Sequence, residues 1–195
     1  MRELNRRCNY VNLKNPLYIQ YHDDEWGVPE HCDQKLYELL LLECFQAGLS
    51  WECILNKRDN FRQAFDGFDI DKVCSYDKAK CDELLNNPGI IRNRLKVSAA
   101  INNSIVFKKI QHEYGSFDKY IWGYTNGEVI IEDYAMRTTS PLSDAISKDL
   151  KNRGMKFVGS TIVYSYLQAI GIMNAHGKEC DLCVCGAEGK GGRKA

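Results

Sequence analysis

The turn at Asn87-Pro88-Gly89 is the feature that most constrains the fold of this 195-residue chain. Proline interrupts a helix, and glycine permits the tight turn that must follow. Before the turn, Asp77 can cap a short helix that extends through Asn86. After it, apolar residues recur at helical spacing from Ile91 to about His112. The sequence therefore predicts two helices joined by a hairpin.

The start of the second helix has the features of a phosphate-binding site. The first backbone N–H groups of a helix have no partner within it, and the helix dipole adds partial positive charge there. Residues 84–112 contain no acidic side chain, and Arg92, Arg94 and Lys96 would add a salt-dependent attraction to DNA. The residues predicted to contact a DNA backbone, without reading its sequence, are Gly89, Ile90, Ile91, Arg92 and Arg94. The alternative is a solvated basic face, because a net charge of zero gives no general argument for nucleic acid.

The composition favours a mostly helical fold. The chain is 44% hydrophobic with only four prolines, and we expect helices over 34–47, after Asp33 as cap, and over 160–172. Asn126-Gly127 allows a short β-hairpin within 120–132. We find no signal peptide and no apolar run long enough to cross a membrane, so we expect a cytoplasmic monomer. The Gly- and Lys-rich tail, 186–195, is expected to be disordered.

One carboxylate falls on the apolar side of the helix expected over 34–47. Glu43 lies in line with Leu36, Leu40 and Ala47 at helical spacing, whereas Glu38 does not. A buried carboxylate is costly unless it is bonded or has a function. It could bond to buried backbone or tyrosine hydroxyl groups, or it could bind a ligand in an aromatic cleft.

Aromatic side chains near Glu43 in the sequence favour the second possibility. The candidates for such a cleft are Tyr18, Tyr21, Trp26 and Trp51. A carboxylate among aromatic rings suits a flat base that is cationic or rich in hydrogen-bond donors.

Two thiols and two imidazoles lie near the ends of the chain. Cys8 and His22 are separated by thirteen residues, and His176 and Cys180 by three. These four groups could complete a tetrahedral zinc site with no open position, which is typical of a structural metal. Cys183 and Cys185 are rival ligands, and an unmetallated cysteine-rich tail is the alternative. We do not expect a disulfide framework from the nine cysteines in a reducing compartment.

Several long segments of the sequence resemble the 3-methyladenine DNA glycosylase I (Tag) family. They are residues 17–29 (LYIQYHDDEWGVP), 46–51 (QAGLSW) and 156–161 (KFVGST), with 88–92 (PGIIR) and 174–176 (NAH) matching in order. The resemblance runs from Cys8 to about Cys185. It implies a helix-hairpin-helix DNA glycosylase fold in one unit, 1–185. The hairpin lobe would cover about 60–115, and the two ends would pack into a second lobe.

The resemblance also implies an activity and the residues that serve it. The activity is hydrolysis of the N-glycosidic bond of 3-methyladenine in alkylated double-stranded DNA, releasing the free base and leaving an abasic site. Glu43 would hydrogen-bond the edge of the extruded base and Trp51 would stack on it. Tyr18, Tyr21 and Trp26 would complete the pocket, with Gly48 and Leu49 beside it. Cys8, His22, His176 and Cys180 would bind one structural Zn²⁺.

Most members of the wider superfamily carry a catalytic aspartate downstream of the hairpin. Here the first carboxylates after Gly89 are Glu113 and Asp118. Neither lies in a sequence context that is recognisable for that role. The Tag family lacks this aspartate, so its absence agrees with the resemblance.

Two other functions remain open. A non-catalytic, zinc-stabilised DNA-binding module explains the hairpin and the metal ligands. A zinc hydrolase acting on small molecules would need an open ligand position on the metal.

Overall fold

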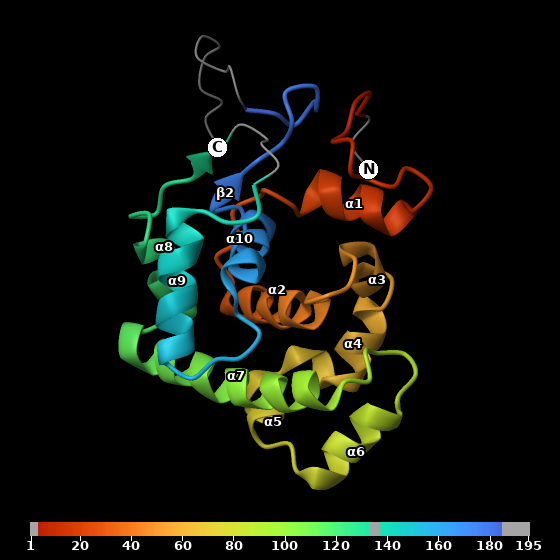
Figure 1. The fold of residues 1–195 in the computed structure, drawn as a ribbon, viewed down its shortest axis with the longest axis vertical. Helices are drawn as coiled ribbons and strands as arrows, with labels where there is room; N and C mark the ends of the chain where they lie inside the picture. Colours follow the sequence, from red (N-terminus) through yellow and green to blue (C-terminus); the bar gives the residue numbers. More distant parts are fainter. Residues whose placement is uncertain (1–3, 133–136, 185–195) are drawn as a thin grey trace.

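Helices dominate the computed structural model, which describes residues 4–132 and 137–184 (Figure 1). In chain order they are α1 (Pro16–Asp24), α2 (Asp33–Gln46), α3 (Trp51–Leu55), α4 (Arg58–Ala64), the 3-10 turn η1 (Asp66–Phe68), α5 (Ile70–Cys74), α6 (Lys78–Asn86), α7 (Arg94–Tyr114), α8 (Phe117–Gly123), α9 (Pro141–Asn152) and α10 (Ser160–Ala169). The two strands are β1 (Ile130–Ile131) and β2 (Met173–Asn174). The mostly helical fold predicted from composition is therefore confirmed.

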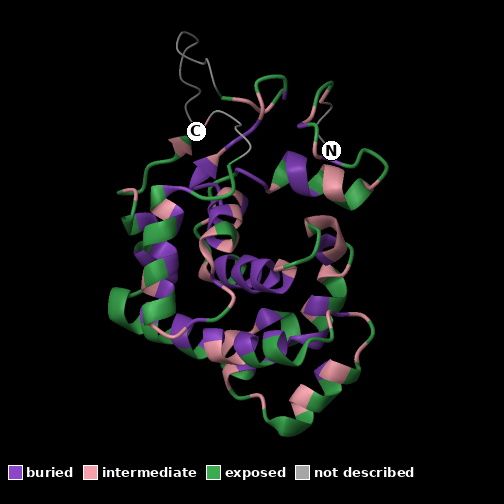
Figure 2. Ribbon diagram, in the orientation of Figure 1, coloured by how far each residue is buried: buried purple, intermediate pink, exposed green. Residues whose placement is uncertain are grey.

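Helix α2 lies at the centre of the molecule and is surrounded by the other helices (Figures 1 and 2). Every residue from Leu36 to Phe45 is buried, so the helix is enclosed all round rather than along one stripe. It packs against α10, α7, α3 and α8. Removing its leucine side chains from water stabilises the fold by about 1.5–3 kcal/mol each. This central position fixes where Glu43 points.

The capping residues differ from the predictions at two helices. Cys32, not Asp33, precedes α2, and the Asp33 carboxylate accepts the Phe117 and Asp118 amides at 2.9 and 2.8 Å, at the start of α8. Asn93 caps α7 by accepting the amides of its first turn, so this helix begins at Arg94 rather than at Ile91.

The predicted β-hairpin within 120–132 is wrong. Helix α8 covers the first part of that range, and β1 pairs in parallel with β2, with Ile130 opposite Met173. Helix α10 ends at Ala169, three residues before the predicted end at 172, and β2 begins directly after that predicted end, at Met173. The sequence signal for the hairpin was local, whereas the real partner lies far along the chain.

Helices α6 and α7 form the predicted hairpin. Asp77 caps α6 by accepting the Lys80 amide at 2.9 Å. The turn is tight at Gly89, because a Cβ there would lie about 3.0 Å from the Asn87 side chain and 3.1 Å from that of Asn60, and both side chains would have to shift.

The two ends of the described chain meet at one side of the fold (Figure 1). The Asp181 carboxylate accepts the backbone amides of Asn5 and Arg6 at 2.7 and 3.1 Å. Among the residues described, no helix is both long and apolar enough to cross a membrane. The tail predicted to be disordered, 186–195, and the rival ligand Cys185 lie outside the described residues.

Candidate functional site

A buried cluster of thiols and imidazoles joins the two ends of the chain. The ligand atoms of Cys8, His22, His176 and Cys180 all lie within 4.8 Å of one another. The Cys180 Sγ lies 3.7 Å from the His22 Nε2 and 3.6 Å from the His176 Nδ1, and the Cys8 Sγ lies 3.6 Å from the same His176 nitrogen. The structure therefore brings together all four predicted ligands, and the cluster could hold a metal ion.

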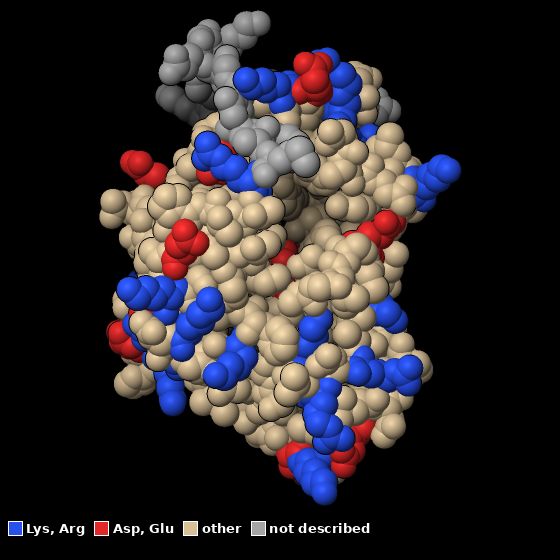
Figure 3. Space-filling view, in the orientation of Figure 1, with Lys and Arg blue, Asp and Glu red and all other residues tan. Residues whose placement is uncertain are grey.

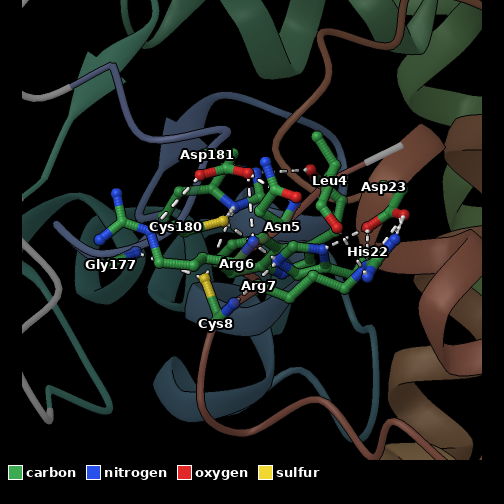
Figure 4. Close-up of polar contacts among 12 residues, drawn as sticks. Leu4, Asn5, Arg6, Arg7, Cys8, His22, Asp23, Gly177, Cys180 and Asp181 are labelled. Atoms are coloured by element: carbon green, nitrogen blue, oxygen red, sulfur yellow. Dashed lines mark hydrogen bonds and ion pairs between the residues drawn. The ribbon is translucent and has the colours of Figure 1, made fainter. Parts of the chain in front are cut away.

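The second nitrogen of each imidazole has its own partner. His22 Nδ1 lies 2.8 Å from the Asp23 carboxylate, which Arg7 holds from the other side (Figure 4). His176 Nε2 lies 3.3 Å from the Trp26 carbonyl. Burial lowers the pKa of His176 to about 4, so its ring stays neutral, as a metal ligand must be. Such outer contacts orient metal-bound histidines in proteins.

Beside this cluster the surface is hollowed into a pocket of about 250 Å³. Figure 3 shows the hollow in the centre of one face, with acidic atoms inside it. The residues that line it are Tyr10, Tyr18, Tyr21, Trp26, Glu43, Gln46, Trp51, Arg137, Ser165 and Gln168. Five of these were predicted from the sequence; Gly48 and Leu49 are not among them and lie in the short loop between α2 and α3.

Glu43 is the buried acid of this pocket. Its side chain comes from the central helix, and no described residue is a hydrogen-bond partner for its Oε2 atom. Burial raises the pKa of Glu43 to about 8. The indole Nε1 of Trp51 is also buried without a partner among the described residues. The pocket therefore offers one unused acceptor and one unused donor to a ligand.

Glu38, one and a half turns earlier on α2, has the opposite environment. It is also buried, which the stripe did not predict, but it accepts hydrogen bonds from Arg58 at 2.6 Å and from Arg62 at 3.0 Å. The lack of partners at Glu43 is therefore particular to its position, and does not extend to every buried acid of α2.

Trp26 belongs to both the pocket and the metal-ligand cluster. Its ring stacks on His22 at 6.3 Å between centroids and meets His176 edge-on at 4.7 Å. Tyr10 packs edge-on against Trp26 at 5.4 Å. One wall of the pocket therefore rests directly on the imidazoles.

The predicted DNA contacts lie around the α6–α7 turn. Arg92 and Arg94 are exposed, Gly89 and Ile91 are half-buried, and Ile90 is buried. On the face that Figure 3 shows, Lys and Arg side chains gather below the hollow over α7 and its neighbours. Lys96 does not serve this surface, because it is buried and donates to the Phe45 and Ala47 carbonyls, at 2.7 Å each. The sequence predicts this lysine to lie on the basic face. Its real contacts depend on tertiary packing, which local sequence does not reveal.

Sequence reasoning missed some pocket residues and the partners of the first carboxylates after the hairpin. Tyr10, Ser165 and Gln168 had no motif or spacing to mark them, Gln46 lies in the segment 46–51 but was given no role, and Arg137 lies in a loop. Glu113 pairs with Arg153 at 2.6 Å, and Asp118 lies 2.7 Å from His31. Neither carboxylate lines the pocket.

Comparison with known proteins identifies the class to which this fold and pocket belong. Residues 11–184 match the methyladenine glycosylase family. The chain belongs to this family.

Curated relatives and solved structures share most of their length with the chain. DNA-3-methyladenine glycosylase 1 of Escherichia coli is 42% identical, over 89% of this chain and 95% of that protein. DNA-3-methyladenine glycosylase of Haemophilus influenzae is 37% identical, over 89% and 96%.

Among solved structures, a crystal structure of 3-methyladenine DNA glycosylase I is 42% identical, with a TM-score of 0.87, and covers 91% of this chain and 100% of its own. A tyrosine-to-phenylalanine variant of such an enzyme, in complex with 3-methyladenine, has a TM-score of 0.85 at 37% identity, over 90% and 96%.

Proposed function

We propose that the protein is a monofunctional DNA glycosylase of base-excision repair. It hydrolyses the N-glycosidic bond of 3-methyladenine in alkylated double-stranded DNA and leaves an abasic site. The observation that carries the proposal is the buried, unpartnered carboxylate of Glu43 inside an aromatic pocket. The similarity to enzymes named for this activity supports it. The enzyme acts as a monomer in the cytoplasm on alkylated double-stranded DNA, with free 3-methyladenine as its product, and does not act on membranes.

The chemistry of the substrate explains why one carboxylate suffices. 3-Methyladenine in DNA is a cation, so breaking its glycosidic bond releases a neutral base without the need for an acid. The chain therefore acts by extruding the base and by binding it best as the bond breaks. Ionised Glu43 accepts hydrogen bonds from the donor edge of the base and rejects bases that present acceptors there. Trp51 stacks on the base, and Tyr18, Tyr21 and Trp26 enclose it.

The α6–α7 turn holds the DNA backbone in this proposal. It supplies a helix-hairpin-helix contact through Gly89, Ile90, Ile91, Arg92 and Arg94. Asn93 accepts the amides of Leu95 and Lys96, and Asn87 accepts those of Gly89 and Ile90. The backbone donors for a phosphate therefore come from Ile91 and Arg92. Gly48 and Leu49 lie between α2 and α3, beside the extruded base.

The metal ion of the cluster is one structural Zn²⁺. A tetrahedral zinc with ordinary bond lengths separates sulfur from nitrogen ligands by about 3.6 Å. Three of the four sulfur–nitrogen separations in the cluster are 3.6, 3.6 and 3.7 Å, and the fourth is within 4.8 Å. Four protein ligands leave no open position, which argues against a zinc hydrolase. Zinc would join the two ends of the single unit, 1–185, and stabilise the lobe opposite the hairpin lobe, about 60–115.

Release of free base from methylated duplex DNA tests the proposal. We expect 3-methyladenine among the products separated by chromatography, with 7-methylguanine left in the DNA. Tight binding to abasic DNA by a folded, zinc-loaded sample that releases no base would instead favour the DNA-binding module.

Glu43→Gln tests the role of the carboxylate. This variant keeps the shape of the side chain but loses its charge, so release of 3-methyladenine should fall at least about a hundredfold while the fold is retained. Glu128→Gln, an exposed position before β1, is the matched control and should release base at the wild-type rate. Normal activity in Glu43→Gln would exclude the proposed role.

A further inference from the structure

Lys96 is a buried cation that connects the α6–α7 turn to the base pocket. Its backbone amide is held by Asn93 at 3.1 Å, in the first turn of α7. Its ammonium group donates to the carbonyls of Phe45 and Ala47, both at 2.7 Å, at the end of α2. Only about 8% of the residue is exposed, so the side chain cannot contact a DNA phosphate without leaving its site.

The end of α2 has carbonyl groups that need such a donor. The last carbonyls of a helix have no partner within it, and they carry the negative end of the helix dipole. The Leu49 amide donates to the Gln46 carbonyl at 2.7 Å. Lys96 donates to the carbonyls on either side of it, those of Phe45 and Ala47. A positive charge at this end also opposes the negative potential near the Glu43 carboxylate.

The bonded segment joins two residues of the pocket. Glu43 lies one turn before the Ala47 carbonyl, and Trp51 begins α3 after the intervening loop. A second lysine contacts the hairpin from the α3 side, because Lys57 donates to the Pro88 and Gly89 carbonyls at 3.2 and 3.3 Å. Two lysines therefore link the hairpin region to the segments on either side of α3, through four ammonium–carbonyl contacts, and Lys96 is the buried one of the two.

We propose that Lys96 is a positioning residue for base excision, which fixes the end of α2 and the loop 47–50 relative to the α6–α7 hairpin. DNA bound at the hairpin thereby meets a Glu43 carboxylate held at a fixed depth and a Trp51 ring in fixed orientation. The inference rests on the proposed glycosylase function. Lys96 acts through the backbone of α2 and touches neither base nor phosphate.

Single-turnover kinetics on DNA containing 3-methyladenine separate this role from a phosphate contact. In Lys96→Met we expect the rate of base release at saturating enzyme to fall about tenfold to a hundredfold, because small misplacements of catalytic groups have effects of this size. The enzyme concentration for half-saturation, and the slope of log affinity for abasic DNA against log salt, should stay unchanged. Lys109→Met, an exposed lysine of the same helix, should change the rate less than about twofold.

Two further measurements separate positioning from simple loss of stability. Lys96→Arg keeps the charge and two parallel donors, and should restore most of the rate. Exchange of the Leu49 amide hydrogen should accelerate at least about tenfold in Lys96→Met and remain slow in Lys109→Met. A lower melting temperature with an unchanged rate per folded molecule would overturn the proposal. A slope of log affinity against log salt that falls by the amount for about one phosphate contact would also overturn it, because Lys96 would then contact DNA.

Failure of the proposed function would look different. If the wild-type protein releases no 3-methyladenine, the function is wrong whatever Lys96 does. If wild type is active and Lys96→Met is equally active, the inference alone fails. If Lys96→Met does not fold, Lys96→Arg decides. A folded Lys96→Arg variant with a reduced rate and with faster exchange of the Leu49 amide would contradict a role based on charge and donors.

Discussion

The metal-ligand cluster and the pocket lie next to each other but differ in whether their buried polar groups have hydrogen-bond partners. In the cluster, both imidazoles have a partner on the nitrogen that faces away from the thiols, and Arg7 in turn holds the Asp23 carboxylate. In the pocket, Glu43 Oε2 and Trp51 Nε1 are buried without partners among the residues described. Both sites contain buried ionisable groups, so burial by itself does not distinguish them.

The difference supports the proposal that the cluster serves stability and the pocket serves a ligand. A buried polar group that lacks a partner costs about 1–3 kcal/mol of stability. A fold keeps such a group where a ligand supplies the missing hydrogen bond. The outer contacts of the cluster are complete, whereas the pocket has no donor for the Glu43 carboxylate among the described residues.

Removal of the metal should have the largest effect. Cys180→Ser takes one ligand from the cluster, so we expect loss of bound zinc and a fall in the free energy of unfolding of at least about 5 kcal/mol, since zinc binding and folding are coupled. Chelation of wild-type protein should act in the same direction. Zinc content and thermal unfolding measure both.

Cys183→Ser is the matched control for that variant. Cys183 is the rival ligand within the described chain and lies outside the four-residue cluster, so zinc content and melting temperature should match those of wild type. Loss of zinc in this variant, with zinc retained in Cys180→Ser, would reassign the ligand.

Glu43→Gln should stabilise the protein at neutral pH. Because the pKa of Glu43 is raised to about 8 in the fold, ionisation favours the unfolded chain: stability is highest below about pH 4.5 and is lost as the pH rises toward 8. Glutamine removes this cost, so Glu43→Gln should gain about 3 kcal/mol at pH 7 and about 1 kcal/mol or less at pH 5. Urea unfolding at the two pH values measures the difference. An equal gain in the free energy of unfolding at both pH values would show that the charge of Glu43 is not the cause of the gain.

The pH dependence of base release should follow the same carboxylate. The empty pocket holds Glu43 protonated below about pH 8, and the cationic base requires the ionised form. We expect kcat/KM to rise about tenfold per unit between pH 6 and 7 and to level off above about 8. In Glu43→Gln the residual rate should be independent of pH over this range.

The hairpin arginines should give the smallest effect. Arg92→Met removes an exposed charge beside the turn, and should weaken binding to abasic DNA only a few-fold at low salt, with the log–log salt slope reduced by about 0.9. The rate of base release at saturation should not change. A reduced rate with an unchanged slope would place Arg92 in the pocket machinery instead.

Local sequence patterns predicted the helices and the buried position of Glu43. The features that these patterns missed depend on tertiary contacts. Spacing alone put Glu43 on a buried face, and Asp77 capped its helix as expected. Asp33 was assigned to its own helix but serves α8, because a carboxylate caps whichever amides packing brings to it. Lys96 and the pairing of β1 with β2 likewise depend on segments far apart in the sequence. The four cluster residues could be grouped because cysteine and histidine are few, but their meeting in space needed the fold.

The edge-on contact between Trp26 and His176 has a consequence for the order of synthesis. A nascent chain reaches Cys180 only after every residue that lines the pocket has been made. Until then, the His176 imidazole that packs against Trp26 lacks its contact with the Cys180 thiol, 3.6 Å away in the fold. We therefore expect products of ribosomes that stall before residue 180 to fold their central helices but to lack the complete cluster against which Trp26 packs.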